Sequence, residues 1–460
     1  MTSREDPLTV DWSRFQRPLP DWYADAKFGI FVHWGAYSVP AWAEPTGELG
    51  TVDECTWFRH NAYAEWYWNT IRFDDNPARK HHQETYGDAP YDDFLDAWRA
   101  EEFDPQDWCA LFARAGARYV VPTTKHHDGI ALWDAPGTAT RNTVHRGPRR
   151  DLIGDLAGAV REAGMRFGVY YSGGLDWSVT PHLPVIDTSA NVRALRPNDA
   201  AYAAYAYVHV RDLVEKYRPD VLWNDIEWPD GGKHDGRLGL AELFRHFYAT
   251  VPDGVVNDRW GDTHRDFRTS EYQHHLDAEG APAWENCRGI GLSFGYNQVE
   301  DSRHLMSGPR LVRHLVDVVS RGGNLLLNVG PTASGLIPDG QRRTLEELAS
   351  WMAVHGDVVH GSRPLDAAIA DVSDEPWVRW TRTGDRAWAV VDASGRRGGR
   401  KPAEPAGRVK VVLPARADRL ELASASRADG TPVPAQADPA GIAVELPPHD
   451  APVAVGFDIR

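Results

Sequence analysis

Short apolar runs alternate with longer amphipathic segments along the first three quarters of the chain. Eight runs have the length and composition of strands: Phe28–Val32, Arg118–Pro122, Arg166–Tyr171, Asp220–Trp223, Gly254–Val256, Phe267–Thr269, Gly291–Phe294 and Asn324–Val329. Segments with a helical period lie between several of them: Asp104–Ala115, Leu152–Ala163, Ala200–Tyr217, Leu238–Thr250, Pro309–Ser320 and Gln341–Val354. Such alternation is typical of a parallel α/β fold, and eight strands between residues 28 and 355 favour a (β/α)₈-like barrel.

An open, doubly wound sheet is the alternative topology. The dinucleotide-binding form of that fold needs a glycine-rich G-x-G-x-x-G turn after its first strand. His33, Trp34 and Gly35 follow the first predicted strand instead, so this turn is absent. We therefore expect the barrel.

The pattern changes beyond His360. Short strand-like runs are separated there by Gly, Pro and Asp turns, and they are Trp377–Thr381, Arg386–Val391, Arg408–Leu413, Arg419–Ala423 and Gly441–Leu446. This spacing predicts an all-β sandwich, which divides the chain into a catalytic barrel (1–358) and a C-terminal β-sandwich (359–460). We expect Ser394–Gly407 to be a mobile surface loop, and the aperiodic, aromatic-rich segment Gly35–Tyr91 to shape a site.

The composition argues against two kinds of binding partner. The net charge of −16 argues against nucleic acid or an anionic membrane surface, because both need a basic face. Met1–Val10 carries no apolar signal stretch and the three cysteines are widely spaced, so we expect a cytoplasmic protein without disulfides. The 19 tryptophans outnumber the 14 phenylalanines, which favours a carbohydrate site. A homo-oligomer is compatible with this composition.

Polar and titratable residues follow most of the predicted strands. They are His33-Trp34-Gly35, Lys125-His126-His127-Asp128-Gly129, Tyr171-Ser172, Asn224-Asp225, Asn257-Asp258-Arg259, Glu271-Tyr272 and Tyr296-Asn297. In a barrel the carboxyl ends of the strands share one face, where active sites form. Plain surface loops would favour Lys, Glu and Ser over the His, Tyr and Trp found here. The series therefore predicts a site on that face.

Carboxylates are the strongest catalytic candidates at this face. Asp225 follows a predicted strand and lies between Trp223 and Trp228 in the sequence. Burial among aromatic rings would raise its pKa, whereas a nearby cation such as Arg259 would keep it ionised. Glu271 follows a later strand at the same face. Two such carboxylates can flank a glycosidic bond, one as nucleophile and one as acid/base.

The sequence gives weaker support to two other kinds of catalytic site, a histidine metal site and a nucleophilic serine. His33, His126 and His127 suggest a metal site, but adjacent residues in a strand or turn point in different directions, so hydrogen bonding within the protein or to sugar hydroxyls is favoured over metal. The run Gly291-Leu292-Ser293-Phe294-Gly295 matches the letters of a nucleophilic serine turn. It lies within a predicted strand rather than at a strand-to-helix turn, which argues against a catalytic serine.

Several motifs resemble those of glycoside hydrolase family 29, the α-L-fucosidases. They occur in order through nearly the whole predicted barrel: Ala26–Gly35 with Ser38–Trp42, Glu65–Tyr67, Thr124–Gly129, Tyr170–Ser172, Leu222–Asp225, Asn257–Trp260, Glu271–Tyr272, Gly291–Asn297 and Gly322–Pro331. The resemblance implies a retaining exo-α-L-fucosidase that acts on fucosylated oligosaccharides through a covalent fucosyl-enzyme and needs no metal or other cofactor.

The resemblance also implies roles for individual residues. Asp225 corresponds to the nucleophile and Glu271 to the general acid/base. Positions that hold the sugar hydroxyls correspond to His33, Glu65, Trp66, His126, His127, Tyr171 and Arg259, and those that line the sugar's methyl face to Trp223 and Phe294. Glu227 stands where some relatives carry glycine, which adds a second carboxylate close to Asp225 in the sequence.

Two other classes of function are weighed against this one. A catalytically silent sugar-binding protein would keep the barrel and lose the acids, but Asp225 and Glu271 are both present. A metal-dependent hydrolase would use His33, His126 and His127, and its activity would depend on metal. A turnover assay separates the first alternative from an enzyme, and a chelator separates the second.

Overall fold

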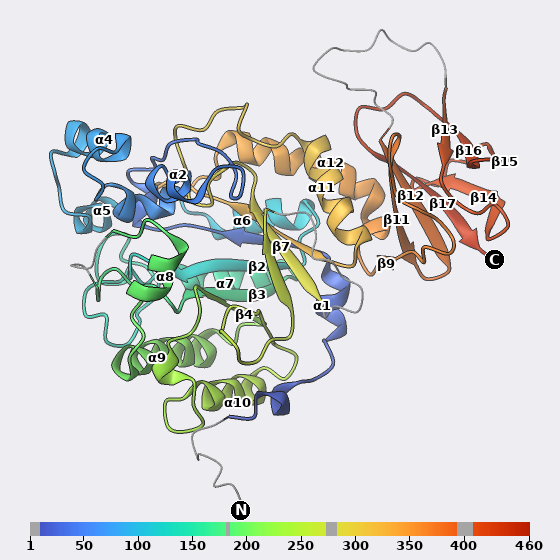
Figure 1. Cartoon of the computed structure of the whole chain (residues 1–460). Helices are drawn as coiled ribbons and strands as arrows, with labels where there is room; N and C mark the ends of the chain where they lie inside the picture. The colour runs from blue at the N-terminus through green and yellow to red at the C-terminus, as the bar shows by residue number, and fades with distance from the viewer. Residues whose placement is uncertain (1–9, 181–184, 273–282, 393–407) are drawn as a thin grey trace, which may run out of the picture.

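The computed structural model describes residues 10–180, 185–272, 283–392 and 408–460. Eight parallel strands lie in the order β5-β4-β3-β2-β1-β8-β7-β6 (Figure 1). They are β1 Phe28–Val32, β2 Tyr119–Lys125, β3 Arg166–Ser172, β4 Val221–Asp225, β5 Val255–Val256, β6 Arg268–Glu271, β7 Trp284–Gly289 and β8 Asn324–Val329. The strands at the two edges of this sheet are β5 and β6. The N–H groups of Asp266 and Phe267, just before β6, donate to the carbonyl oxygen of Val256 in β5 at 2.9 and 3.4 Å and so join these edges. The result is the predicted (β/α)₈-like barrel.

One predicted strand is wrong. Gly291–Phe294 is a loop, and the strand of that region is β7, seven residues earlier at its start. Strand β7 is hard to see in the sequence because Glu285, Asn286 and Arg288 interrupt its apolar pattern. These polar side chains are buried, and hydrogen bonds inside the fold satisfy them. The other seven predicted runs overlap strands of the barrel.

Helices surround the barrel in Figure 1. The described helices are η1 Trp12–Phe15, α1 Asp21–Ala26, η2 Ala36–Ser38, α2 Glu54–Arg59, η3 Ala64–Trp66, α3 Tyr67–Thr70, α4 Pro77–Tyr86, α5 Asp92–Ala97, α6 Pro105–Arg114, α7 Leu152–Glu162, α8 Ser189–Leu195, α9 Ala200–Tyr217, η4 Asp230–Gly232, α10 Leu240–Thr250, α11 Gly308–Ser320 and α12 Asp339–Val359. Asp104 caps α6, because its carboxylate accepts from the N–H groups of Gln106 and Asp107. None of these helices is long and apolar enough to cross a membrane.

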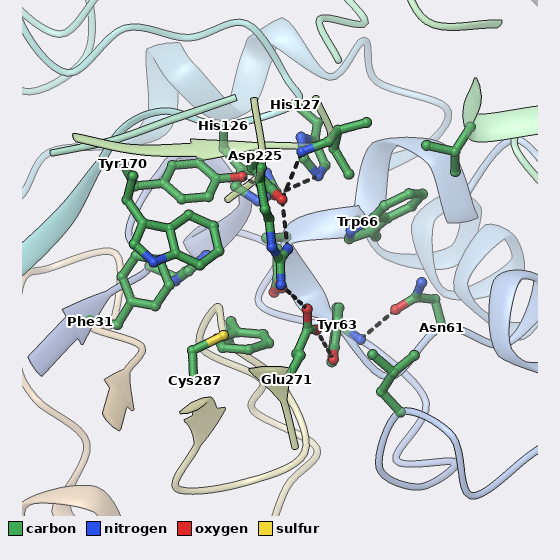
Figure 2. A pocket seen from close by; sticks show the side chains of 18 of the residues that line it. Phe31, Asn61, Tyr63, Trp66, His126, His127, Tyr170, Asp225, Glu271 and Cys287 are labelled. Atoms are coloured by element: carbon green, nitrogen blue, oxygen red, sulfur yellow. Dashed lines mark hydrogen bonds and ion pairs between the residues drawn. The ribbon is translucent and has the colours of Figure 1, made fainter. Parts of the chain in front are cut away.

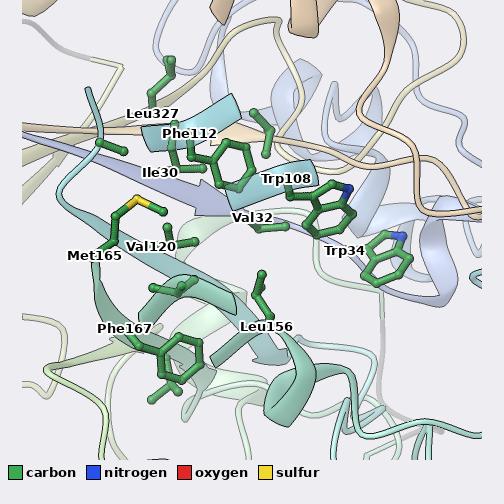
Figure 3. Close-up of a cluster of buried hydrophobic side chains, with 14 of the residues drawn as sticks. Ile30, Val32, Trp34, Trp108, Phe112, Val120, Leu156, Met165, Phe167 and Leu327 are labelled. Carbon is green, nitrogen blue, oxygen red and sulfur yellow. The ribbon is translucent and has the colours of Figure 1, made fainter. Parts of the chain in front are cut away.

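Alternation along the strands divides the barrel core into two layers. Ile30 and Val32 of β1 pack outward against α6 and α7, together with Val120 and Leu327 (Figure 3). Phe31, between them, points into the barrel and packs with Trp223. Neighbouring side chains of a strand face opposite sides of the sheet. The outer layer therefore packs against the helices, and the inner layer forms the floor of any site at the rim.

A β-sandwich follows the barrel, as predicted. One sheet has the order β10-β11-β12-β17-β14 with β9 beside β11, and the other β13-β16-β15. The strands are β9 Arg363–Pro364, β10 Ser373–Asp374, β11 Trp377–Thr383, β12 Arg386–Asp392, β13 Val409–Leu413, β14 Leu420–Arg427, β15 Ala435–Asp438, β16 Gly441–Leu446 and β17 Val453–Ile459. The predicted division at residues 358 and 359 lies at the end of α12. The predicted loop Ser394–Gly407 lies outside the described residues.

The sandwich packs on α11 and α12 of the barrel (Figure 1). Trp377 and Trp388 belong to the same buried apolar cluster as these helices. The indole N–H of Trp351 on α12 donates to the Pro452 carbonyl oxygen at 2.7 Å, and Arg379 pairs with Asp317. The sandwich therefore supports the barrel on the side of these two helices.

Candidate active site

A cavity of about 150 Å³ opens at the carboxyl ends of the barrel strands (Figure 2). Ten of the eleven residues predicted for the site line it: His33, Glu65, Trp66, His126, His127, Trp223, Asp225, Arg259, Glu271 and Phe294. They come from β4, β6 and η3 and from the segments that follow β1, β2, β5 and β7. The barrel thus brings together residues that lie far apart in the sequence, as the series of polar strand ends predicts.

Asp225 is the last residue of β4 and points into the cavity. The Tyr170 hydroxyl donates to its Oδ2 at 2.7 Å, and Nη1 of Arg259 donates to its Oδ1 at 2.8 Å. Burial alone would raise the pKa of this carboxyl, but Arg259 and the Tyr170 hydroxyl hold it below its ordinary value. Asp225 is therefore a buried anion in the wall of the cavity.

Arg259 joins the two candidate catalytic acids. Its Nη1 binds Asp225, and its Nη2 lies 3.1 Å from Oε2 of Glu271. The guanidinium also lies over the Trp223 ring, 4.6 Å from the ring centroid. The Tyr63 hydroxyl donates to the other oxygen of Glu271 at 2.7 Å (Figure 2). The positions of both carboxylates are thus fixed by one cation and two tyrosines.

The three histidines meet in the cavity, although His126 and His127 were expected to point in different directions. The ring centroids of His126 and His127 are 4.0 Å apart. Strand β2 ends at Lys125, so the alternation of a strand does not govern the two residues that follow. Burial lowers the pKa of His33 to about 3 and that of His127 to about 4, which keeps both rings neutral. No three His, Cys, Asp or Glu side chains of the described ranges are grouped as metal ligands.

Glu65 is a third acid in the cavity wall. The N–H group of Gly295 donates to its Oε2 at 2.7 Å. Burial raises the pKa of Glu65 to about 8, and this hydrogen bond opposes the shift only in part. At neutral pH the group is mostly a carboxylic acid, which can both donate to and accept from a sugar hydroxyl.

The placement predicted for Tyr171 is wrong, and Tyr170 occupies the site instead. Tyr171 points out of the barrel, where its hydroxyl lies 3.1 Å from Nδ1 of His209 on α9. In the β3–β4 ladder Tyr170 pairs with Trp223 and Tyr171 with Asn224. Paired residues face the same side of a sheet, so Tyr170 shares the interior with Trp223.

Other lining residues were not predicted from the sequence. They include Phe31, Asn61, Tyr63, Tyr170 and Cys287. Tyr63 and Asn61 belong to Gly35–Tyr91, the segment expected to shape a site, and the alternation of β3 and β4 would have identified Tyr170. Cys287 lies on β7, the strand that the sequence pattern misses.

Comparison with known proteins decides the family. A family model described as alpha-L-fucosidase matches residues 2–357. The chain belongs to the α-L-fucosidase family. It is 32% identical to the α-L-fucosidase of Dictyostelium discoideum over 82% of this chain and 78% of that protein. It is 31% identical to the human tissue α-L-fucosidase over 83% of this chain and 78% of that protein.

Solved structures of α-L-fucosidases have the same fold. A Thermotoga maritima α-fucosidase in complex with a mechanism-based inhibitor is 42% identical and superposes with a TM-score of 0.85, covering 97% of this chain and 99% of that one. Another α-L-fucosidase structure is 43% identical, with a TM-score of 0.86 over 97% and 99% of the two chains. The chain is thus a glycoside hydrolase of this family in sequence and in fold.

Two residues singled out in the sequence lie apart from the chemistry of this α-L-fucosidase site. Glu227 forms ion pairs with Lys233 and with Arg196, the latter at 3.5 Å, and does not line the cavity. The hydroxyl of Ser293 donates to the Gly295 carbonyl oxygen at 2.6 Å and accepts from the Ala64 N–H at 2.9 Å. Glu227 has the geometry of a loop ion pair, and Ser293 that of a turn.

Proposed function

We propose that the chain is a retaining exo-α-L-fucosidase with Asp225 as nucleophile and Glu271 as general acid/base. The observation that carries this proposal is the shared arginine: Arg259 lies 2.8 Å from Asp225 and 3.1 Å from Glu271. One guanidinium that holds both acids favours the short separation of retaining pairs, about 5–5.5 Å, over the longer one of inverting pairs. A relative solved with a mechanism-based inhibitor supports the same chemistry.

In the first step the Asp225 carboxylate attacks the anomeric carbon. Glu271 gives its proton to the glycosidic oxygen, the bond to the leaving group breaks, and a fucosyl ester forms on Asp225. In the second step Glu271 takes a proton from a water molecule, which attacks the same carbon and frees Asp225. Two inversions leave fucose with its original α configuration.

The wall of the cavity suits a fucosyl unit. His33, His127 and Glu65 face the cavity and can bind ring hydroxyls, while Phe294 and Trp223 offer apolar surface to the methyl group. A cavity of about 150 Å³ is of the order that holds one six-membered ring. We therefore propose that the enzyme removes single terminal fucosyl residues from fucosylated oligosaccharides.

The test is hydrolysis of an aryl α-L-fucoside followed by proton NMR, together with a panel of fucosylated oligosaccharides. We expect turnover with α-L-fucose as the first anomer to appear. The β anomer first would overturn the retaining mechanism. No turnover on any of these substrates would indicate a silent sugar-binding protein.

Glu271→Ala tests the acid/base role. Without the proton donor, the rate on a natural disaccharide should fall far more than the rate on an aryl fucoside with a good leaving group, since only the former needs protonation. Equal losses on both substrates would remove Glu271 from this role. Tyr63→Phe is a matched variant, because it removes the hydroxyl that donates to Glu271 and leaves the carboxylate in place.

A further inference from the structure

The side chain of Asn328 determines where the proton of His33 sits. Oδ1 of Asn328 lies 2.7 Å from Nδ1 of His33. The amide nitrogen of Asn328 donates to the Phe294 carbonyl oxygen at 2.6 Å, which fixes the orientation of the amide. An amide oxygen can only accept, so Nδ1 of His33 must carry the proton.

Ser172 does the same for His127. Its Oγ lies 2.7 Å from Nδ1 of His127 and 2.8 Å from the Leu175 carbonyl oxygen. A hydroxyl has one proton, and the carbonyl oxygen can only accept it. The hydroxyl oxygen must therefore accept from His127, whose proton also sits on Nδ1.

Both rings then present a bare Nε2. Each ring lines the cavity and is neutral, since burial holds the pKa of His33 near 3 and that of His127 near 4. Hydrogen bonds between described residues involve neither Nε2. The neighbour of the His127 Nε2 is Oδ2 of Asp225 at 3.9 Å, another acceptor and too far for a hydrogen bond.

We propose that Asn328 and Ser172 are positioning residues that lock His33 and His127 as Nδ1–H tautomers, so that each Nε2 accepts a hydrogen bond from a sugar hydroxyl. The identity of the sugar rests on the proposed function, but the lock itself exists in the free protein. Recognition at these two positions depends on ring hydroxyl donors, which a fucose analogue deoxygenated at either hydroxyl lacks.

The lock on His127 also protects the nucleophile. If the proton moved to Nε2, it would lie between the ring and Oδ2 of Asp225, and a small rotation would form a direct hydrogen bond. That bond would stabilise the anion and reduce its nucleophilicity. Ser172 therefore keeps His127 from competing with the substrate for Asp225.

Long-range proton–nitrogen NMR of the free enzyme, with ¹⁵N-labelled histidine, reads the tautomers directly at neutral pH. His33→Gln and His127→Gln assign the signals. We expect both rings in the wild-type enzyme to show the Nδ1–H pattern. In Ser172→Ala we expect His127 to leave this pattern, His33 to keep it, and kcat/KM on an aryl fucoside to fall about tenfold, the cost of one hydrogen bond.

Thr124→Val is the matched control. The Thr124 hydroxyl is buried and donates to the Tyr170 carbonyl oxygen at 2.7 Å, as Ser172 donates to that of Leu175, but none of the described histidines hydrogen-bonds to it. This variant should lose similar stability and leave both histidine signals in place. Ser172→Thr, which keeps the hydroxyl, should restore the His127 pattern.

An Nε2–H pattern for His127 or His33 in the wild-type enzyme would overturn the proposal. It would equally fail if Ser172→Ala lost activity with the His127 pattern unchanged, since Ser172 would then act on the fold alone. The measurement is independent of turnover. An enzyme that shows both Nδ1–H patterns and hydrolyses no fucoside would contradict the proposed function and leave the tautomer lock intact.

Discussion

Two buried carboxylates lie on either side of Trp223, and their pKa values are shifted in opposite directions. Glu285 of β7 accepts from the Trp223 indole N–H at 3.0 Å and from the hydroxyls of Tyr23 and Tyr119 at 3.0 and 2.5 Å. Burial raises its pKa to about 7 in spite of these three donors. Asp225 has fewer neutral donors, but Arg259 is beside it, and its pKa is lowered.

The difference shows which neighbour sets the charge of a buried acid. Neutral hydroxyl and indole groups do not fully replace the water that Glu285 loses, whereas one guanidinium more than replaces it for Asp225. Trp223 separates the two, with its N–H on Glu285 and its ring under Arg259. The barrel interior therefore has one carboxyl below its rim, Glu285, that binds a proton readily and one at the rim, Asp225, that stays charged.

Asp225→Gly should have the largest effect. This substitution removes the charged carboxylate, whereas Glu285 stays. We expect kcat on an aryl α-L-fucoside to fall on the order of 10⁴-fold, with the circular dichroism spectrum of the fold unchanged. Added azide should restore part of the rate and yield the inverted β-fucosyl azide, because the small anion fills the space of the lost carboxylate. A variant with near-normal rate would contradict the nucleophile assignment.

Arg259→Met should turn the environment of Asp225 into one like that of Glu285. With the cation gone, the Tyr170 hydrogen bond opposes burial only in part and the pKa of Asp225 rises, so the acidic limb of the kcat/KM profile should move to higher pH. We expect kcat/KM at neutral pH to fall about 10²- to 10³-fold.

Arg196→Met is the control for this change. Arg196 pairs with Glu227 and Asp230 outside the cavity, so its loss should leave the acidic limb where it is. If Arg259→Met also left the limb unmoved, Arg259 would not be what keeps Asp225 ionised.

Glu285→Gln should remove a pH dependence of stability. The folded chain keeps the Glu285 proton up to about pH 7, whereas the unfolded chain releases it near the ordinary value of 4.5. The wild-type protein is thus most stable below the ordinary value and loses up to roughly 3 kcal/mol through this group as the pH rises to about 7. Glutamine does not titrate, so urea unfolding should show the wild-type free energy of unfolding falling relative to the variant across this range. Parallel profiles would show that Glu285 has the same pKa in the folded and unfolded chain.

Glu227→Gln should have the smallest effect on catalysis. Glu227 lies two residues from Asp225, but its carboxylate pairs with Lys233 and Arg196 and does not reach the cavity. We expect kcat and KM on an aryl fucoside to stay within about twofold of wild type, because this ion pair lies outside the cavity. A tenfold loss of kcat would mean that Glu227 takes part in the reaction.

The sequence predicts the fold well where local pattern and tertiary packing agree. The barrel, most of its strands and the sandwich follow from apolar runs and turn residues. The pattern fails at β7 because this strand puts Glu285 and Asn286 into the interior, where tertiary partners alone make them tolerable. A periodicity argument cannot see such partners.

The sequence likewise predicts some residues of the candidate site and misses others. The polar strand ends and the family motifs predict ten lining residues, since position after a strand fixes the face. Tyr171 is wrong by one residue because the alternation of a strand has to be counted from a residue of known direction, such as the Trp223 that pairs with Tyr170. Tyr63 comes from a long loop that has no repeat pattern, so its contact with Glu271 appears only in three dimensions.

The most direct test of the account is to trap the covalent intermediate. A 2-deoxy-2-fluoro fucosyl fluoride forms the fucosyl-enzyme quickly and releases it slowly, so intact mass spectrometry should show one added fluorofucosyl group. Peptide mapping should place it on Asp225. A label on Glu271, Glu65 or Glu227, or a failure to trap an enzyme that does hydrolyse fucosides, would contradict Asp225 as the nucleophile.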